Sequence, residues 1–274
     1  MENSKILYIS QEITPFLPSS EISEIARHLP QHMLENGNEI RVFMPRFGCI
    51  NERRHQLHEV IRLSGMNLVI DDADHPLIIK VASIPTARMQ VYFIDNEEFF
   101  QRKAVLTDDK GKYFDDNDER SMFFCKGVLE TVKKLGWKPD IVHCHGWMTA
   151  MVPFFIKNLF NEDPHFAESK LIYTAYDSAF DKPLDKNLLG KYEYEGLETE
   201  QVEYLKDASF ANINKLAFDY SDAIVFGSKN LPKDVIKIAE QTGKPILEYR
   251  NEEEYREANQ NFYHEVFNES SVLA

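Results

Sequence analysis

Lys5-Ile6-Leu7-Tyr8-Ile9, followed by the loop Ser10-Gln11-Glu12-Ile13-Thr14-Pro15-Phe16-Leu17-Pro18-Ser19-Ser20, decides the fold of this chain. The first part is a short apolar run of β-prone residues and predicts a strand. A helix is predicted after the loop, because apolar residues then recur at helical spacing, at Ile22, Ile25, Ala26, Leu29 and Met33. Asn36-Gly37 is a helix-ending signal, and a second apolar strand follows at 39–45. A β-α-β unit this early in a chain is typical of a parallel, doubly wound sheet.

The loop is unusual for its position. In an open α/β sheet, the corner between the first strand and its helix commonly binds phosphate, through backbone N–H groups exposed by glycine and a nearby cation. This loop contains neither glycine nor lysine, and the helix starts with Ser19, Ser20 and Glu21 instead. The position therefore favours a ligand site, while the residue types do not favour phosphate.

The rest of the chain continues the alternation of strands and helices. Residues 59–94 contain shorter alternating strands, and 96–117 is a polar excursion. Further strands are predicted at 141–144, 171–175, 223–227 and 245–247, and helices at 118–135, 147–160, 212–220, 232–240 and 252–267. Residues 177–196 are predicted to be a loop. We expect an α/β fold, a three-layer α/β/α Rossmann-like domain with a mainly parallel twisted sheet.

Composition narrows the possible functions. The chain has 274 residues, is 43% hydrophobic, and carries a net charge of −14, which argues against nucleic-acid and anionic-membrane partners. The basic residues Arg41, Arg46, Arg53 and Arg54 could hold an acidic partner, although a solvated face is the simpler interpretation. The three cysteines have no framework spacing and no apolar run is long enough to span a bilayer, so we expect reduced thiols and a cytoplasmic location.

The order of several motifs resembles the N-terminal domain of bacterial glycogen and starch synthases. Ser10–Phe16 looks like that family's S-x-E-x-x-P-F opening, and residues 113–124 look like its Y…DN-x-ERF-x-FF. Residues 140–153, Asp-Ile-Val-His-Cys-His-Gly-Trp-Met-Thr-Ala-Met-Val-Pro, are similar to its DIVHAHDWHTALVP, the most specific stretch. The resemblance implies one half of a two-domain GT-B architecture. It also implies a retaining hexosyltransferase that moves glucose from ADP-glucose to an α-1,4-glucan.

The chain departs from the family pattern where the resemblance implies chemistry. The family's phosphate-binding K-x-G-G-L is replaced within Leu17–Ile22, which has no lysine, serines for glycines and an added glutamate. The family's H-D-W becomes His145-Gly146-Trp147, and its T-x-H-N becomes Thr174-Ala175-Tyr176-Asp177. We expect residues 1–248 to form the synthase-like domain and 249–274 an amphipathic helix packing back on it, with the second glycosyltransferase domain absent.

Candidate binding residues, taken as a vestigial cleft, are Glu12, Ser19, Ser20, His145, Trp147, Tyr176 and Asp177. Each has a plainer alternative: a surface or capping role for Glu12, inherited packing for His145, and core packing for Trp147. Tyr176 and Asp177 replace a catalytic pair, and they either bind a new ligand or fill a dead pocket. His143-Cys144-His145 would alternate between sheet faces, which argues against convergence on a metal. We predict no catalytic residue, no metal and no cofactor.

These departures favour a glycogen synthase-like protein that is catalytically degenerate on its own, a pseudoenzyme with a binding or regulatory role. Its expected partners are a weakly bound glucan or sugar nucleotide and a protein that replaces the second domain. Two alternatives stay open: a half-enzyme completed by a partner chain, and an adaptor whose cleft is filled. An open polar cleft near Glu12, His145 and Tyr176 would favour binding, and one plugged by residues 177–196 would favour the adaptor.

Overall fold

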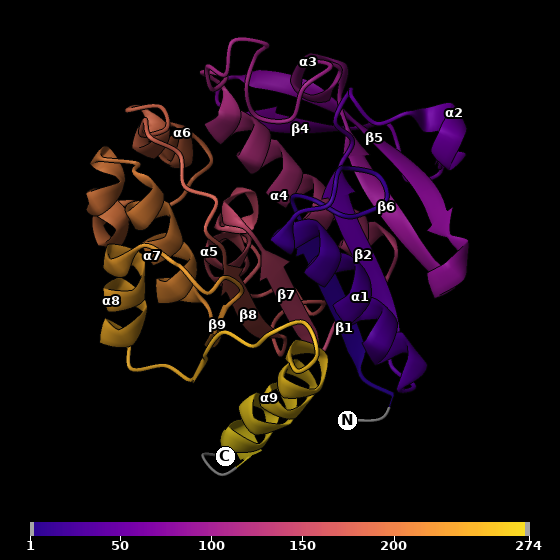
Figure 1. Cartoon of the computed structure of the whole chain (residues 1–274). Helices are drawn as coiled ribbons and strands as arrows, with labels where there is room; N and C mark the ends of the chain where they lie inside the picture. Colours follow the sequence, from indigo (N-terminus) through magenta and orange to yellow (C-terminus); the bar gives the residue numbers. More distant parts are fainter. Residues whose placement is uncertain (1–2, 272–274) are drawn as a thin grey trace.

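The computed structural model describes residues 3–271, and the side chains of residues 3–267. One twisted sheet forms the centre of the molecule (Figure 1), with strand order β10-β9-β8-β7-β1-β2-β6-β5-β3, and β4 pairs with β5 outside this path. The parallel strands are β1 (Lys5–Ser10), β2 (Glu39–Pro45), β6 (Met89–Asp95), β7 (Ile141–His145), β8 (Lys170–Ala175), β9 (Ala223–Phe226) and β10 (Ile246–Leu247). The antiparallel strands β3 (His58–Glu59), β4 (Met66–Ile70) and β5 (Ala73–Ile84) extend one edge. The predicted α/β class with a mainly parallel sheet is confirmed.

Helices cover both faces of the sheet. The α-helices are α1 (Glu21–Glu35), α2 (Glu52–His55), α3 (Glu97–Phe100), α4 (Asn117–Lys134), α5 (Met151–Asn158), α6 (Leu188–Tyr194), α7 (Phe210–Tyr220), α8 (Lys233–Gln241) and α9 (Tyr255–Ser271). The 3-10 helices are η1 (Pro85–Ala87), η2 (Trp147–Thr149) and η3 (Glu200–Lys206). Helix α6 corrects the prediction that residues 177–196 form only a loop: Leu188, Leu189 and Tyr192 are buried, and this burial stabilises a turn-rich segment as a helix.

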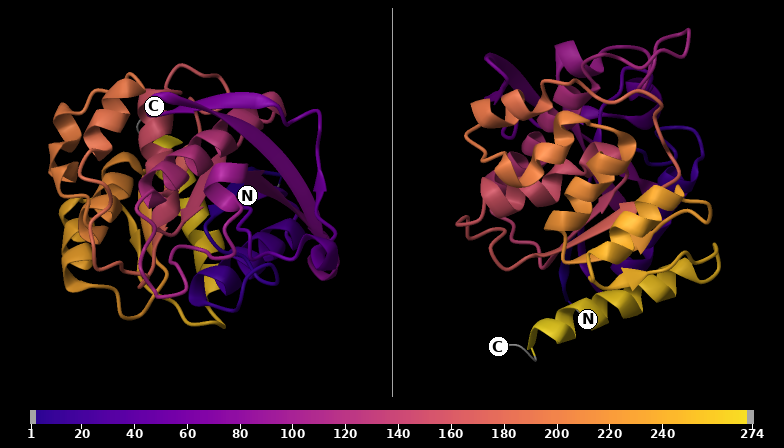
Figure 2. Two further views of the ribbon diagram at one scale, coloured as in Figure 1. Left: turned by 90° about the horizontal axis from the view of Figure 1, so that it is seen from above. Right: turned by 90° about the vertical axis from the view of Figure 1, so that its left-hand side faces the viewer.

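The two faces can be told apart at β7. His143 bonds the hydroxyl of Tyr263 on α9, whereas its neighbour Cys144 lies near Cys125 of α4. Since successive strand residues point to opposite faces, α9 and α4 cover opposite sides of the sheet. Helix α9 lies beside α1, as two perpendicular views show (Figures 1 and 2), and His32 of α1 contacts Gln260 of α9 at 2.8 Å.

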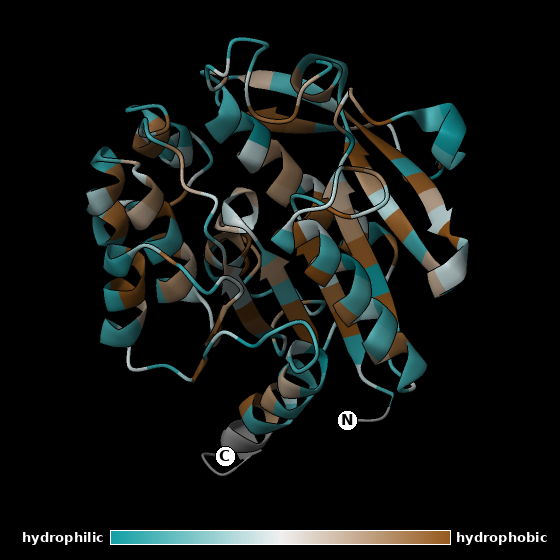
Figure 3. Cartoon of the chain, in the orientation of Figure 1, coloured by the Kyte–Doolittle hydropathy of each residue, from teal (hydrophilic) through white to brown (hydrophobic). Residues whose placement is uncertain are grey.

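The hydrophobic core lies along the central strands of the sheet. Residues of β1, β7 and β8 are almost all buried, and hydropathic colouring shows apolar strands inside and polar outer helix faces (Figure 3). Burying both faces requires apolar strand residues on both, which is the pattern of a parallel sheet enclosed by helices. None of the helices in the described part of the chain combines the length and apolarity that a membrane crossing requires. The division of the chain at residue 248 and the lack of a second domain stay predictions.

Candidate functional site

The carboxyl ends of β1, β7 and β8 meet at the start of α1, and this corner is where open α/β sheets bind ligands. Two backbone bonds tie the strand ends together: Gln11 N–H to the His145 carbonyl at 3.3 Å, and Gly146 N–H to the Thr174 carbonyl at 3.2 Å. Gly146 has φ +84°, and a Cβ there would lie 2.5 Å from Oε1 of Gln11. That oxygen accepts the Met148 N–H at 3.2 Å. The Gly146 position therefore needs glycine, both for its backbone conformation and for the approach of Gln11.

The N-terminus of α1 is capped by its own residues. Ser20 Oγ accepts the Ser23 N–H at 3.1 Å, and Ser23 Oγ accepts the Ser20 N–H at 2.8 Å, which is a reciprocal capping box. The Ser20 hydroxyl donates to Oε2 of Glu12 at 2.6 Å. Glu12 is therefore held on the helix end, where its negative charge suits the positive end of the helix dipole. A carboxylate of the chain itself is thus bonded to the N-cap residue of α1.

A second carboxylate lies on the same helix end. The Ser228 hydroxyl donates to Oε2 of Glu21 and accepts the Asp177 N–H at 3.0 Å. These bonds join α1 to the segments that follow β8 and β9. Asp177 itself is exposed, so its backbone, rather than its side chain, participates in the corner.

The side chain of His145 is buried and contacts that of Tyr176. Both side chains are buried, and Nδ1 of His145 lies 2.8 Å from the Tyr176 hydroxyl. Burial lowers the pKa of His145 to about 3, so the ring is neutral. The Tyr176 ring fills the space above Gly227, where a Cβ would lie 2.4 Å from Cε1 of the ring. Nε2 of His145 is buried without a hydrogen-bond partner among the described residues.

Trp147 packs into the core. Its side chain is 1% exposed, and its ring meets Phe180 edge-on with centroids 5.0 Å apart. Phe180 also contacts Phe210 at 5.5 Å, so the segment after β8 folds down over the tryptophan. Trp147 therefore presents no open face on which a sugar ring could stack.

His143 belongs to a buried polar chain that sequence reasoning missed. Its Nδ1 lies 2.6 Å from the Tyr263 hydroxyl, its Nε2 lies 2.6 Å from Oγ1 of Thr174, and the Tyr263 hydroxyl lies 3.1 Å from that of Tyr8. Burial and nearby His145 lower the pKa of His143 well below its usual range. A neutral ring satisfies both contacts, because one nitrogen donates and the other accepts.

The prediction that the alternating faces of β7 keep His143, Cys144 and His145 apart is correct only for the cysteine. His143 and His145 share a face, with ring centroids 4.1 Å apart, and only Cys144 points to the opposite side. Positions i and i+2 of a strand always share a face, so the alternation separates the cysteine from the pair rather than the histidines from each other. No group of three or more metal-ligating side chains converges anywhere in residues that the structure describes.

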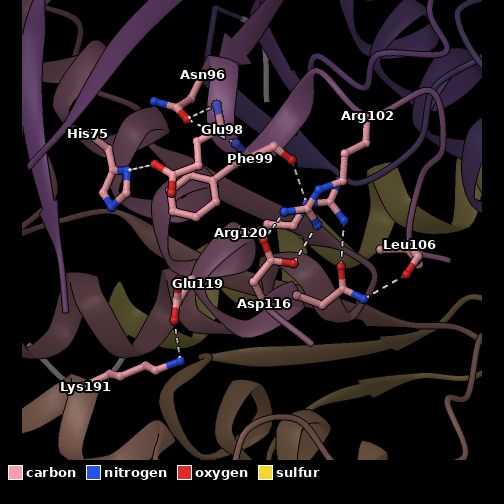
Figure 4. A network of polar contacts seen from close by, with 11 residues as sticks. His75, Asn96, Glu98, Phe99, Arg102, Leu106, Asp116, Glu119, Arg120 and Lys191 are labelled. Atoms are coloured by element: carbon pink, nitrogen blue, oxygen red, sulfur yellow. Dashed lines mark hydrogen bonds and ion pairs between the residues drawn. The ribbon is translucent and has the colours of Figure 1, made fainter. Parts of the chain in front are cut away.

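The motif at 113–124 stabilises neighbouring segments (Figure 4). Arg102 pairs with Asp116, and buried Arg120 donates to the Phe99 carbonyl at 2.8 Å and to Oδ1 of Asn117 at 2.6 Å. Burial lowers the Arg120 pKa to about 10. In the first turn of α4, the carboxylates of Asp118 and Glu119 accept hydrogen bonds from the ammonium of Lys191 on α6, at 2.7 and 2.6 Å. This charged motif therefore holds residues 97–117 and α6 onto α4.

Two grooves flank the α1 corner. One, of about 600 Å³, is bounded by Glu12, Ser19 and Ser20 on one side and by residues 103–109 and Tyr113 on the other. The second, of about 640 Å³, lies between α1 and residues 249–255. Three carboxylates, from Glu21, Glu24 and Glu252, face a single guanidinium in the second groove, that of Arg250. Charge balance in that groove is unfavourable for a diphosphate.

The structure thus separates the predicted site residues into residues that line grooves, buried residues, and one exposed residue. Glu12, Ser19 and Ser20 come together at the α1 corner and line open grooves. His145 and Tyr176 contact each other in the core, Trp147 is buried against Phe180, and Asp177 stands apart on the surface. Whether any of them binds a substrate stays a prediction.

Comparison with known proteins identifies the family. Residues 5–246 match the model of the starch synthase catalytic domain. The chain belongs to this family. A glycogen synthase of Pelodictyon phaeoclathratiforme is 32% identical over 243 residues, which cover 88% of this chain and 49% of that protein. A glycogen synthase of Chlorobium limicola is 38% identical over 176 residues, which cover 64% of this chain and 36% of that protein.

The fold of this starch synthase-type domain is also found in a solved structure. The catalytic domain of Starch Synthase IV from Arabidopsis thaliana, bound to ADP and acarbose, matches with a TM-score of 0.74 and 18% identity, over 91% of this chain and 52% of that one. The chain spans about half the length, or less, of the relatives it matches. The predicted resemblance and the GT-B-type Rossmann-like fold are confirmed.

Proposed function

We propose that this starch synthase-type domain binds an α-1,4-glucan in a regulatory role and does not itself transfer glucose from ADP-glucose. One observation carries the proposal: the α1 N-terminus is capped by Ser20, and Ser20 is bonded to the Glu12 carboxylate at 2.6 Å. Transfer from a sugar nucleotide requires stabilisation of the departing diphosphate by positive charge or N–H donors. Here Ser20 Oγ accepts the Ser23 N–H and its hydroxyl is bonded to Glu12, no lysine lies in the loop, and the added Glu21 would repel the diphosphate.

The matched relatives are named glycogen synthases, and the solved neighbour holds ADP and acarbose. These names support two candidate ligands, a nucleotide and a glucan. The residues of this corner favour the glucan over the nucleotide, because a glucan is uncharged and is not repelled by carboxylates.

The groove bounded by Glu12 and Tyr113 suits a glucan. Its volume of about 600 Å³ is within the range of small-ligand sites, and Leu17, Val105 and Leu106 give it apolar walls beside the carboxylate. Sugars bind such surfaces through their C–H faces, while a carboxylate accepts hydrogen bonds from their hydroxyl groups. A weakly bound glucan is thus accommodated without the buried His145 and Trp147.

Two assays test the proposal: glucosyl transfer from ADP-glucose to maltoheptaose, and calorimetric titration with maltoheptaose. We expect no transfer above background and saturable, weak glucan binding that Tyr113→Ala reduces. Tyr194→Ala is the matched control, because Tyr194 is 57% exposed on α6 and does not line the groove. Transfer at rates usual for a hexosyltransferase would refute the proposal, and so would the absence of any glucan binding.

A further inference from the structure

A third concave surface includes part of the first loop and shares no lining residue with the groove proposed for the glucan. It is about 510 Å³ in volume, and four parts of the chain form it: Thr14–Pro15, Arg27 of α1, residues 54–58, and residues 83–86 at the end of β5 and in η1. We call it the basic groove. Its size is within the range of sites for small molecules.

The basic groove differs in charge from the rest of the molecule. Arg27, Arg54, His55 and His58 line it, and no aspartate or glutamate does, in a chain whose net charge is −14. Neither guanidinium has an ion-pair partner among the described residues. An uncompensated pair of arginines in a concavity is a favourable site for an anion, since Arg binds phosphate in a bidentate manner.

The arginines expected to act together from the sequence are divided by the structure. Arg41 pairs with Glu39 and stacks on Trp137, and Arg46 pairs with Glu52, so these two are used within the fold. Arg54 instead faces the basic groove, where it joins Arg27 from another element. The groove is therefore assembled by tertiary structure and not by one basic run.

Several contacts fix the groove in place. One Nη of Arg27 donates to Oγ1 of Thr86 at 2.8 Å, and the His55 ring meets Phe16 edge-on at 5.1 Å. Holding Arg27 in one geometry lowers the entropy lost when a ligand binds. Hydroxyls of Thr14 and Ser83 and the amide of Gln56 supply neutral hydrogen-bonding groups beside the cations.

We propose that the basic groove binds a small phosphate-bearing molecule, with Arg27 and Arg54 contacting the phosphate group and the neutral groups contacting the remainder. Two guanidiniums that line one groove match the two or more charged oxygens of a phosphate monoester. A groove of about 510 Å³ lined by two arginines favours a small ligand over an extended polyanion, which would need a longer basic track. This site is independent of the function proposed for the α1 corner, because the two grooves share no lining residue.

Calorimetric titration with inorganic phosphate, glycerol phosphate and pyrophosphate tests the site. We expect saturable binding of at least one of them, weakened about tenfold by Arg27→Ala and by Arg54→Ala. Thr86→Val should weaken it by a smaller factor, because Arg27 then loses its positioning contact. Arg53→Ala is the matched control, since Arg53 lies on the same short helix, is exposed, and does not line the groove.

The variants are surface substitutions, and an unchanged urea midpoint will show that each one folds. The site is refuted if none of the three anions saturates below about 10 mM. It is also refuted if Arg53→Ala weakens binding as much as Arg54→Ala, because the attraction is then a diffuse surface charge. Tighter binding of a single-stranded oligonucleotide than of any small phosphate would likewise contradict it.

Discussion

Replacing Tyr263 by phenylalanine should destabilise the protein, because its hydroxyl bonds α9 to the side chains of β1 and β7. The oxygen lies 2.6 Å from Nδ1 of His143 and 3.1 Å from the hydroxyl of Tyr8, and all three side chains are buried. Phenylalanine keeps the ring, so no large cavity forms and the loss is confined to hydrogen bonding.

The magnitude follows from the groups left without a partner. Each buried polar group that loses its partner costs about 1–3 kcal/mol, so loss at His143 and Tyr8 together predicts a decrease of about 2–6 kcal/mol in the free energy of unfolding. Tyr8→Phe together with Tyr263→Phe should cost less than the sum of the two single changes, because the pair is coupled.

Urea unfolding followed by circular dichroism measures this difference. The midpoint should fall with little change in slope, and Tyr194→Phe, at an exposed position, should shift stability by less than about 0.5 kcal/mol. A Tyr263→Phe variant as stable as the unsubstituted chain would refute the reasoning, because it would show that the hydroxyl contributes no net stabilisation.

Three further changes test neighbouring parts of the structure. The pKa of His145 is about 3 in the fold and higher in the unfolded chain, so its contribution to stability is complete above pH 6.5 and is lost as pH falls toward 3. His145→Asn should therefore reduce the slope of the free energy of unfolding against pH, measured by urea unfolding between pH 6 and 4, by the equivalent of about one proton. Gly227→Ala should cost about 1–3 kcal/mol by calorimetry because the new Cβ meets the Tyr176 ring and Cγ2 of Thr174. In a chain that already carries Tyr176→Ala, the cost of Gly227→Ala should be smaller, because the Thr174 contact alone then remains; additive losses would exclude the Tyr176 contact. Lys191→Met should cost about 3 kcal/mol or more in thermal unfolding, because it leaves the buried carboxylate of Asp118 without this ion pair. Lys206→Met, at an exposed pair, should cost under about 1 kcal/mol, and equal losses from the two changes would contradict this account.

Much of the fold was predictable from local pattern. The apolar run at 5–9, the helical spacing from Ile22 to Met33 and the Asn36-Gly37 ending gave β1, α1 and β2 nearly at their observed bounds. These features depend on neighbours in the sequence, where periodicity and turn chemistry are informative. Helix α6 was missed because its formation depends on burial of Leu188, Leu189 and Tyr192 against distant elements.

The site was predictable only in part, because its closure depends on tertiary contacts. The missing glycine and lysine of the first loop could be read directly, but the bond between Ser20 and Glu12 requires the loop to fold back over eight positions. The contact between Tyr263 and His143 joins residues 120 apart, and nothing local to either marks it. The aromatic residues of the tail indicated a packed helix, yet the polar role of one hydroxyl could not be inferred from spacing.

Calorimetric titration of the chain with ADP-glucose tests the central claim most directly. The Glu12–Ser20 contact, the capping box of α1 and the lack of a lysine in the first loop predict no saturable binding up to about 1 mM, since Glu21 would repel the diphosphate and no loop lysine offsets that charge. Saturable binding of ADP-glucose in the micromolar range, abolished by a bulky substitution at Ser20, would show that the corner is open to the nucleotide and would contradict the account.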